Sequence, residues 1–191
     1  MAEPLEDAVE SEDKKVALII AILALFLALA EAGAKNAEHR ATEQNIESSD
    51  LYNFYQAKKI RSTIAETAAQ TLEADRLAAT DPKAQEAMEK QIADWKATIA
   101  KYEKDPKTPE DSLDAIQERA KAAAEGRERS NHKLEHFEYA SGALQIAIVL
   151  ASAAIITGMT ILAWIAGGLG LIGAILMAFG YFAPTVLSFL G

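Results

Sequence analysis

The sequence predicts an all-α, three-pass membrane protein that carries a long extramembrane helical hairpin resembling a coiled coil. Residues 139–191 contain no Asp, Glu, Lys, Arg or His, and residues 16–30 form a second uncharged run. All formally charged side chains therefore lie in residues 1–15 and 31–138. A soluble globular domain does not separate apolar and charged residues in this way, so the pattern excludes a soluble enzyme domain.

The overall composition narrows the chemistry further. The chain has 191 residues, a formal net charge of −9 and no Cys. The missing thiols exclude disulfides, thiolate zinc sites, iron–sulfur clusters and cysteine nucleophiles. The negative charge argues against nucleic acid as a partner. We expect a protein without enzymatic activity and without a cofactor.

The domain order follows from the charge pattern. We expect an acidic N-terminal tail in residues 1–15, a first transmembrane helix in 16–34, a helical hairpin stalk in 35–138 and a transmembrane helical hairpin in 139–190. The alternative for the first apolar run is a secretory signal peptide, because small residues precede Glu31. The six acidic residues before Lys14 favour an uncleaved anchor, since signal peptides begin with positive charge.

The last apolar region is too long for a single span. The cluster Gly167-Gly168-Leu169-Gly170 favours a turn. Splitting the region there predicts spans at Tyr139–Ile165 and Leu169–Ser188, each of spanning length. Pro184 then falls near the end of the third span, where a lost backbone hydrogen bond matters least.

Small residues recur at helical spacing in all three predicted spans. Such stripes let helix backbones approach closely inside a membrane. The stripes consist of Ala17, Ala21, Ala24 and Ala28 in the first span, of Ala143, Ala147, Ala151, Ala154 and Gly158 in the second, and of Gly170, Ala174 and Ala178 in the third. Ser141, Gln145 and Ser152 form a polar face on the second span, which could line a pore or bond a neighbouring helix.

The charged region has the composition of long helices. Ala, Gln and Glu are abundant, and breaks occur only at Thr80-Asp81-Pro82 and at Asp105–Pro109. We therefore expect helices at 31–79, 82–104 and 110–138. At about 1.5 Å per residue, the first helix matches the other two in length, which predicts one ascending and one descending arm.

Apolar residues at coiled-coil spacing predict the packing faces of these helices. The seams consist of Ile46, Ile60, Ile64 and Leu72 in the first helix, of Met88, Ile92, Trp95, Ile99 and Tyr102 in the second, and of Leu113, Ile116, Ala120 and Ala123 in the third. A thin stalk of this kind buries little core, so we expect self-association.

An aromatic cluster in the ascending arm is the strongest candidate for an interaction site. Its residues are Tyr52, Phe54, Tyr55, Gln56 and Lys58. The arm lengths place residues 51–55 opposite Leu113 and Ile116. The aromatic side chains point over a wide arc of their helix, so one side should pack on the descending arm and another on a neighbouring subunit or a protein partner.

The three histidines are weak candidates for metal ligands. His132 and His136 belong to an H-x-x-E-H sequence and share a helix face, and His39 lies at a similar height on the ascending arm. A metal centre needs a third ligand and a shaped cavity, which a thin stalk does not offer. We expect solvated histidines near the membrane surface and no metal site.

The run Ser49–Arg61, with its Tyr-Asn-Phe-Tyr-Gln-Ala-Lys core, resembles the signature of a bacterial membrane family catalogued as domain of unknown function number 4337. The segment Gln145–Ser152 is similar to that family's second span. The order of one N-terminal span, a long helical loop and a C-terminal hairpin is also similar. The resemblance implies a bacterial cytoplasmic (inner) membrane protein, and it implies no activity, cofactor or partner.

Two functions fit these features. The first is a homo-oligomeric, non-enzymatic membrane scaffold that interacts through its stalk. The alternative is a pore-forming or transport-accessory protein with Gln145 and Ser152 around a central axis. Five Lys and Arg residues flank the spans on the stalk side and two on the tail side, which favours a cytoplasmic stalk.

Overall fold

The computed structural model describes residues 3–104 and 107–184, and their side chains from residue 14 onward. These residues form helices and connecting turns, without a strand. The elements are α1 (Glu3–Ala78), α2 (Pro82–Glu103), the short 3-10 helix η1 (Pro109–Asp111), α3 (Leu113–Thr157) and α4 (Thr160–Phe182). The all-α prediction is therefore confirmed for the described residues.

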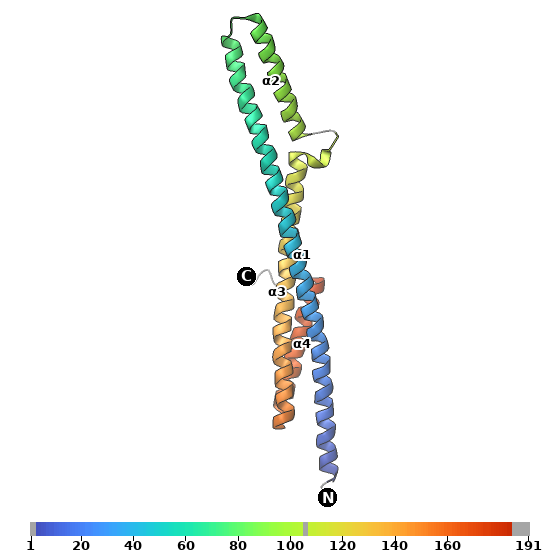
Figure 1. Cartoon of the computed structure of the whole chain (residues 1–191). Helices are drawn as coiled ribbons and strands as arrows, with labels where there is room; N and C mark the ends of the chain where they lie inside the picture. The colour runs from blue at the N-terminus through green and yellow to red at the C-terminus, as the bar shows by residue number, and fades with distance from the viewer. Residues whose placement is uncertain (1–2, 105–106, 185–191) are drawn as a thin grey trace. The chain divides into compact units, whose positions relative to one another are not determined.

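The chain divides into two compact units. One comprises Met1–Thr42 and Arg127–Gly191, and the other comprises Glu43–Gly126. We call the first the three-helix unit, because α1, α3 and α4 build it, and the second the hairpin unit. Both α1 and α3 continue from one unit into the other, as the unbroken ribbons of Figure 1 show.

Helix α1 is longer than the sequence pattern predicted. The acidic tail from Glu3, the first apolar run and the ascending arm all belong to this single helix of 76 residues. No proline occurs between Pro4 and Pro82, and alanine and glutamate, which favour helices, are frequent. The predicted stop is confirmed: Asp81 caps α2 by accepting a hydrogen bond from the Lys83 N–H, and Pro82 is its first residue.

The second predicted break also separates two helices. Helix α2 ends at Glu103, and Pro109 begins η1. Pro106 lies outside the described residues. Helix α3 begins at Leu113 rather than at residue 110, because the Ser112 hydroxyl accepts a hydrogen bond from the Ala115 N–H and so caps the new helix.

The predicted turn of the apolar hairpin was wrong. The turn lies at Gly158 and Met159, and Gly167–Gly170 is in the interior of α4. Gly158 has a φ of 66°, the left-handed conformation in which glycine commonly ends a helix. The spans therefore end at Thr157 and begin at Thr160, and α4 ends at Phe182, before Pro184.

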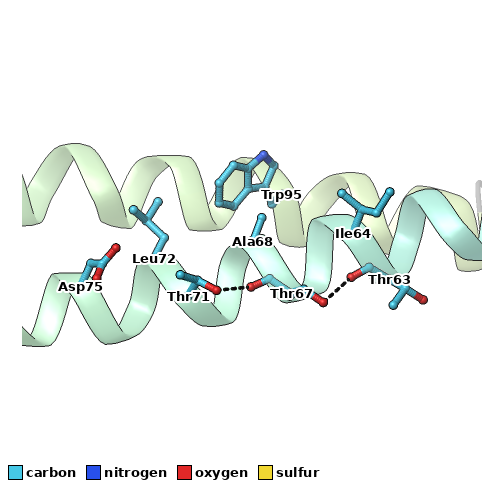
Figure 2. A pocket seen from close by; sticks show the side chains of 8 residues that line it. All are labelled: Thr63, Ile64, Thr67, Ala68, Thr71, Leu72, Asp75 and Trp95. Carbon is cyan, nitrogen blue, oxygen red and sulfur yellow. Dashed lines mark hydrogen bonds between the residues drawn. The ribbon is translucent and has the colours of Figure 1, made fainter.

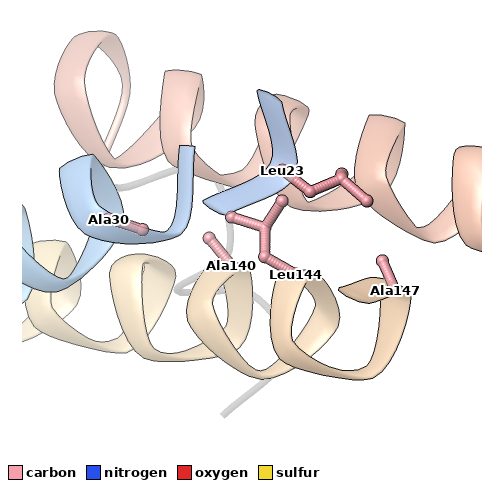
Figure 3. Close-up of a cluster of buried hydrophobic side chains, with 5 residues drawn as sticks. All are labelled: Leu23, Ala30, Ala140, Leu144 and Ala147. Atoms are coloured by element: carbon pink, nitrogen blue, oxygen red, sulfur yellow. The ribbon is translucent and has the colours of Figure 1, made fainter. Parts of the chain in front are cut away.

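Helices α1, α3 and α4 share one apolar core in the three-helix unit. It is formed by Leu23 and Ala30 of α1 and by Ala140, Leu144 and Ala147 of α3 (Figure 3). Helix α4 contributes glycines, since a Cβ added at Gly173 would lie 2.7 Å from Leu144 Cγ. This close approach is the packing that small residues permit between apolar helices.

The small-residue stripe was predicted largely correctly in α3, only in part in α4 and incorrectly in α1. In α3, Ala147, Ala151 and Ala154 are buried, but Gly158 forms the turn and is exposed. In α4, Ala178 is exposed, and the closely packed positions are Ala166, Gly170, Gly173 and Gly180. In α1 the stripe points away from the other two helices of this unit, and its exposed residues are Ala17, Ala21, Ala24 and Ala28.

The hairpin unit has a second core. Leu51 packs with Ile116 and Ala120 of α3, and Tyr55 covers them. The predicted register of residues 51–55 against Leu113 and Ile116 is thereby confirmed. The seam predicted for α2 is also confirmed, because all five of its residues are buried or half-buried, namely Met88, Ile92, Trp95, Ile99 and Tyr102.

The isoleucines of the ascending arm were assigned to the wrong face. Ile46, Ile60 and Ile64 are exposed, whereas the buried positions on this part of α1 are mostly small, with Ser48, Ser62 and Ala69 among them. The Ser48 hydroxyl donates a hydrogen bond of 3.2 Å to the Ala120 carbonyl. Small side chains allow the arms to approach closely, and the large ones point outward as a result.

Within the part of the chain that the structure describes, three helices are long and apolar enough to cross a membrane. They are α1 from Lys14, α3 and α4. At about 1.5 Å per residue, the 23 residues of α4 extend about 34 Å, close to the roughly 30 Å of a bilayer's hydrocarbon core. These lengths and compositions indicate a membrane protein.

Candidate functional site

The aromatic cluster of α1 is divided between two faces. Leu51 is buried and Tyr55 half-buried against α3, whereas Tyr52 and Phe54 are 41% and 42% exposed. Gln56 is also exposed. One side of the cluster therefore holds the two arms together, and the other presents aromatic rings on the surface of this chain.

Lys58 connects the cluster to the break in the descending arm. Its Nζ lies 5.2 Å from the centre of the Phe54 ring, a distance at which a cation is attracted to the ring face. The same nitrogen donates a hydrogen bond to the Asp111 carbonyl, at the end of η1. Lys58 thus stabilises the junction before α3 and also orients Phe54.

An open apolar groove lies beside the exposed isoleucines of α1. Its volume is about 530 Å³, and Trp95 of α2 stands over Ile64, Ala68 and Leu72 of α1 (Figure 2). Along its edge, the hydroxyls of Thr67 and Thr71 bond to carbonyls one turn earlier in their own helix. The hydroxyls are therefore satisfied locally, and the groove offers apolar contact.

The groove was not found from the sequence. Ile60 and Ile64 are 59% and 63% exposed, although their heptad-like spacing had assigned them to the hairpin core. Together with Ile46 they form what we call the outer isoleucine face of the hairpin unit. The signal that could have identified it is the alternative seam of small residues, Ser48, Ser62 and Ala69, on the opposite side of α1.

A charged pair rigidifies α1 near the tip of the hairpin. Arg76 donates hydrogen bonds of 2.8 Å and 3.1 Å to the Glu73 carboxylate one turn earlier. These hydrogen bonds lower the pKa of Glu73 below its usual value and raise that of Arg76. Both groups are exposed to solvent, so the pair contributes local order and little stability.

The polar residues of the second span differ in their hydrogen-bond partners. Gln145 is exposed, and its Nε2 lies 3.5 Å from the Glu31 carboxylate of α1. Ser152 donates to the Ile148 carbonyl of its own helix at 2.8 Å. The Ser141 hydroxyl is buried without a hydrogen-bond partner. Gln145 is therefore exposed on this chain and has the Glu31 carboxylate as its partner.

The three histidines have different environments. His136 is 1% exposed, and neither of its ring nitrogens has a hydrogen-bond partner. His132 lies 3.7 Å from the Glu135 carboxylate, and His39 is on an exposed face of α1. Among the described residues, no three His, Cys, Asp or Glu side chains are grouped to hold a metal ion. The expectation that all three are solvated was wrong for His136.

The comparison with known protein families gives one match over most of the chain. Residues 12–183 match the family described as Domain of unknown function (DUF4337). The chain belongs to this family. The matched range covers α1 from residue 12, the complete hairpin unit and α4, so the DUF4337 domain includes both units. No curated protein and no solved structure matches the chain.

Proposed function

We propose that this DUF4337 protein is a homo-oligomeric, non-enzymatic scaffold of the bacterial cytoplasmic membrane that associates through its hairpin unit. The outer isoleucine face supports the proposal. Isolated exposed apolar residues are common on proteins, but a large apolar patch on a surface indicates an interaction site. Here Ile64 lines a groove with Trp95 at its wall, and the exposed Ile60 lies one turn earlier in α1.

The thinness of the hairpin unit supports the same proposal. Its core cluster contains three buried residues and the half-buried Tyr55. A two-helix arrangement buries only one stripe of each helix, and packing against further helices would cover the rest. Tyr52 and Phe54 would extend the contact, because aromatic residues often anchor interfaces. The outward stripe of alanines on α1 would permit the same close packing between spans of two copies.

The first test charges the outer isoleucine face. We expect Ile60→Glu combined with Ile64→Glu to convert the oligomer to smaller species, because buried carboxylates would be desolvated at the contact. The matched control is Ala93→Glu with Ala97→Glu, which places the same charges at the same spacing on the exposed face of α2. Native mass spectrometry of the detergent-solubilised protein measures the subunit number.

Two outcomes would contradict the proposal. If the wild-type protein is a monomer at micromolar concentration, self-association is not the basis of the proposed scaffold function. An isoleucine double variant with the subunit number of the wild type shows that the outer isoleucine face is not the contact. Equal dissociation of the α2 control indicates general charge repulsion and contradicts the assigned surface.

The orientation proposed for the stalk is cytoplasmic, because Lys and Arg are more frequent on that side of the spans. The chain has no Cys, so single cysteines report accessibility without background. We expect Asn131→Cys to resist a membrane-impermeant maleimide in intact cells and Met159→Cys, in the turn between α3 and α4, to react. Both positions are exposed. The reverse pattern would place the stalk outside, and equal labelling of both would contradict a membrane-spanning α3.

A further inference from the structure

A small basic pocket lies in the three-helix unit where α4 ends. Its volume is about 230 Å³, below the roughly 300–1,000 Å³ of sites for drug-sized molecules. The pocket has room for a small polar group rather than for a whole lipid or metabolite. Its polar lining residues are Asn36, Arg40, Lys133 and Tyr181.

Two glycines let α1 and α4 pack closely against α3 at this pocket. A Cβ added at Gly33 would lie 2.7 Å from the Phe137 ring, and one added at Gly180 would lie 3.2 Å from His136 Cβ. The buried Phe137 ring meets the Tyr181 ring edge-on, with centroids 5.1 Å apart. The pocket is therefore lined by two packed aromatic rings as well as by its polar side chains.

The two cations of the pocket have no acidic partner. The Nε of Arg40 donates to the Asn36 side-chain oxygen at 3.3 Å, which orients the guanidinium. Among the residues that the structure describes, neither Arg40 nor Lys133 forms an ion pair. Two unpaired cations side by side repel each other, and an anion between them would relieve this repulsion.

The nearby acids lie away from the pocket. Helical periodicity of about 100° per residue places Glu31 and Glu38 on the side of α1 opposite the pocket. Glu135 lies on the far side of α3, where it contacts His132. Glu138 follows Phe137, but it is turned about 100° from it around α3 and is exposed. None of these carboxylates lines the pocket, which therefore carries the positive charge of Arg40 and Lys133.

The pocket also lies at a defined level of the apolar helices. Phe137 is two residues before the uncharged stretch of α3, and Tyr181 is in the last turn of α4. Tyrosines are enriched where membrane spans meet the headgroups. If the spans are inserted as the proposed function requires, the pocket opens at headgroup level, where basic pockets between helices bind anionic lipids.

We propose that this pocket binds the phosphate of an anionic glycerophospholipid in the stalk-side leaflet. Arg40 supplies a planar fork of N–H donors for the phosphate oxygens, and Lys133 supplies a second positive charge. Asn36 holds the guanidinium in position. The acyl chains would extend along the apolar surface of the spans.

The test compares phosphatidylglycerol with phosphatidylcholine on the full-length protein in neutral detergent. Native mass spectrometry measures the lipid retained. We expect the wild type to prefer phosphatidylglycerol by about tenfold, and Arg40→Gln with Lys133→Gln to reduce this preference below about twofold. The matched control, Lys15→Gln with Lys35→Gln, removes two exposed cations of the same unit outside the pocket and should keep the preference.

Other outcomes separate the competing explanations. Cations also stabilise helix C-termini, so a purely structural role predicts a lower melting temperature of the double variant even without lipid. Lipid binding predicts that the wild type and the double variant have equal melting temperatures without lipid. It also predicts that phosphatidylglycerol raises the melting temperature of the wild type but not that of the double variant. Equal retention of both lipids by the wild type, or an unchanged preference in the double variant, overturns the proposal. If inorganic phosphate raises the melting temperature as much as phosphatidylglycerol does, the pocket binds a free anion, and the proposal of a lipid ligand is wrong.

Failure of the membrane proposal would be seen separately. Wild-type protein that is released from membranes by alkaline carbonate contradicts insertion itself. Protein that stays inserted and yet binds both lipids equally contradicts only the headgroup site. A Lys133→Arg variant should retain the phosphatidylglycerol preference, because the charge is kept, and its loss would count against recognition by charge.

Discussion

Replacing Gly173 with leucine should separate α4 from α3 and destabilise the three-helix unit. A single added Cβ at this position would already lie 2.7 Å from Leu144 Cγ and 3.2 Å from the Ala140 carbonyl oxygen. The latter is backbone and cannot turn aside. Overpacking of this kind costs about 1–3 kcal/mol, and occasionally more. Thermal unfolding of the detergent-solubilised protein, followed by circular dichroism, measures the loss.

The matched control lies in the same helix. A Cβ added at Gly168 would meet no atom within 4 Å, so Gly168→Leu should leave the packing intact. Replacing glycine in a helix with a good helix former contributes up to about 1 kcal/mol, so this variant should be as stable as the wild type or more stable. Equal melting temperatures for both variants would mean that α4 does not pack on α3 through Gly173.

Truncation of Ile116 to alanine should have the second large effect, this time in the hairpin unit. Its side chain is fully buried against Leu51 and Ala120. Removing a buried isoleucine to alanine costs about 2–5 kcal/mol, because apolar contact is lost and a cavity remains. Hydrogen exchange measured by mass spectrometry should show faster opening of residues 43–126.

The control for this variant is Leu77→Ala, also in the hairpin unit. Leu77 is 73% exposed, and substitutions at such positions change stability by about 0.5 kcal/mol or less. Protection of residues 43–126 in this variant should match the wild type. An Ile116→Ala protein with unchanged exchange would contradict the pairing of α1 with α3 around Leu51.

Features encoded within a few neighbouring residues could be predicted from the sequence. The stop after Ala78 follows from Asp81 and Pro82, which cap and start α2 locally. The buried face of α2 follows from its heptad spacing, because no other stripe of that helix is apolar enough to compete. The register of Leu51 against Ile116 follows from arm length, since each helical residue advances the chain by a constant rise.

The candidate site could be predicted only in part. The aromatic cluster was identified by its density, and the division between Tyr55 facing inward and Phe54 facing outward follows from helical angles. The outer isoleucine face was missed, because hydrophobicity alone favours Ile60 and Ile64 for the core. The close approach of the helices instead selected Ser62 and Ala69, which no rule based on hydrophobicity would choose.

The glycines illustrate the same limit in the apolar region. Gly158 and the Gly167–Gly170 cluster are both plausible turns in an uncharged sequence, and the cluster has the stronger local signal. The structure places the turn at Gly158, and Gly170 and Gly173 pack against Leu23 and Leu144. A glycine can end a helix or admit a neighbour, and only the position of the neighbour distinguishes the two uses.

The sequence is sufficient to predict the all-helical class, the three apolar segments, the charged hairpin between them and the level at which its arms pair. Each of these depends on composition, on helical rise or on a local cap, and none requires knowledge of a distant residue. Only the tertiary structure shows which faces of α1 and α4 are buried and where the apolar hairpin turns. It also decided that Arg40 and Lys133 line one pocket with Gly33 and Gly180. Those outcomes depend on how closely helix backbones approach, because the space between two helices selects small or large side chains.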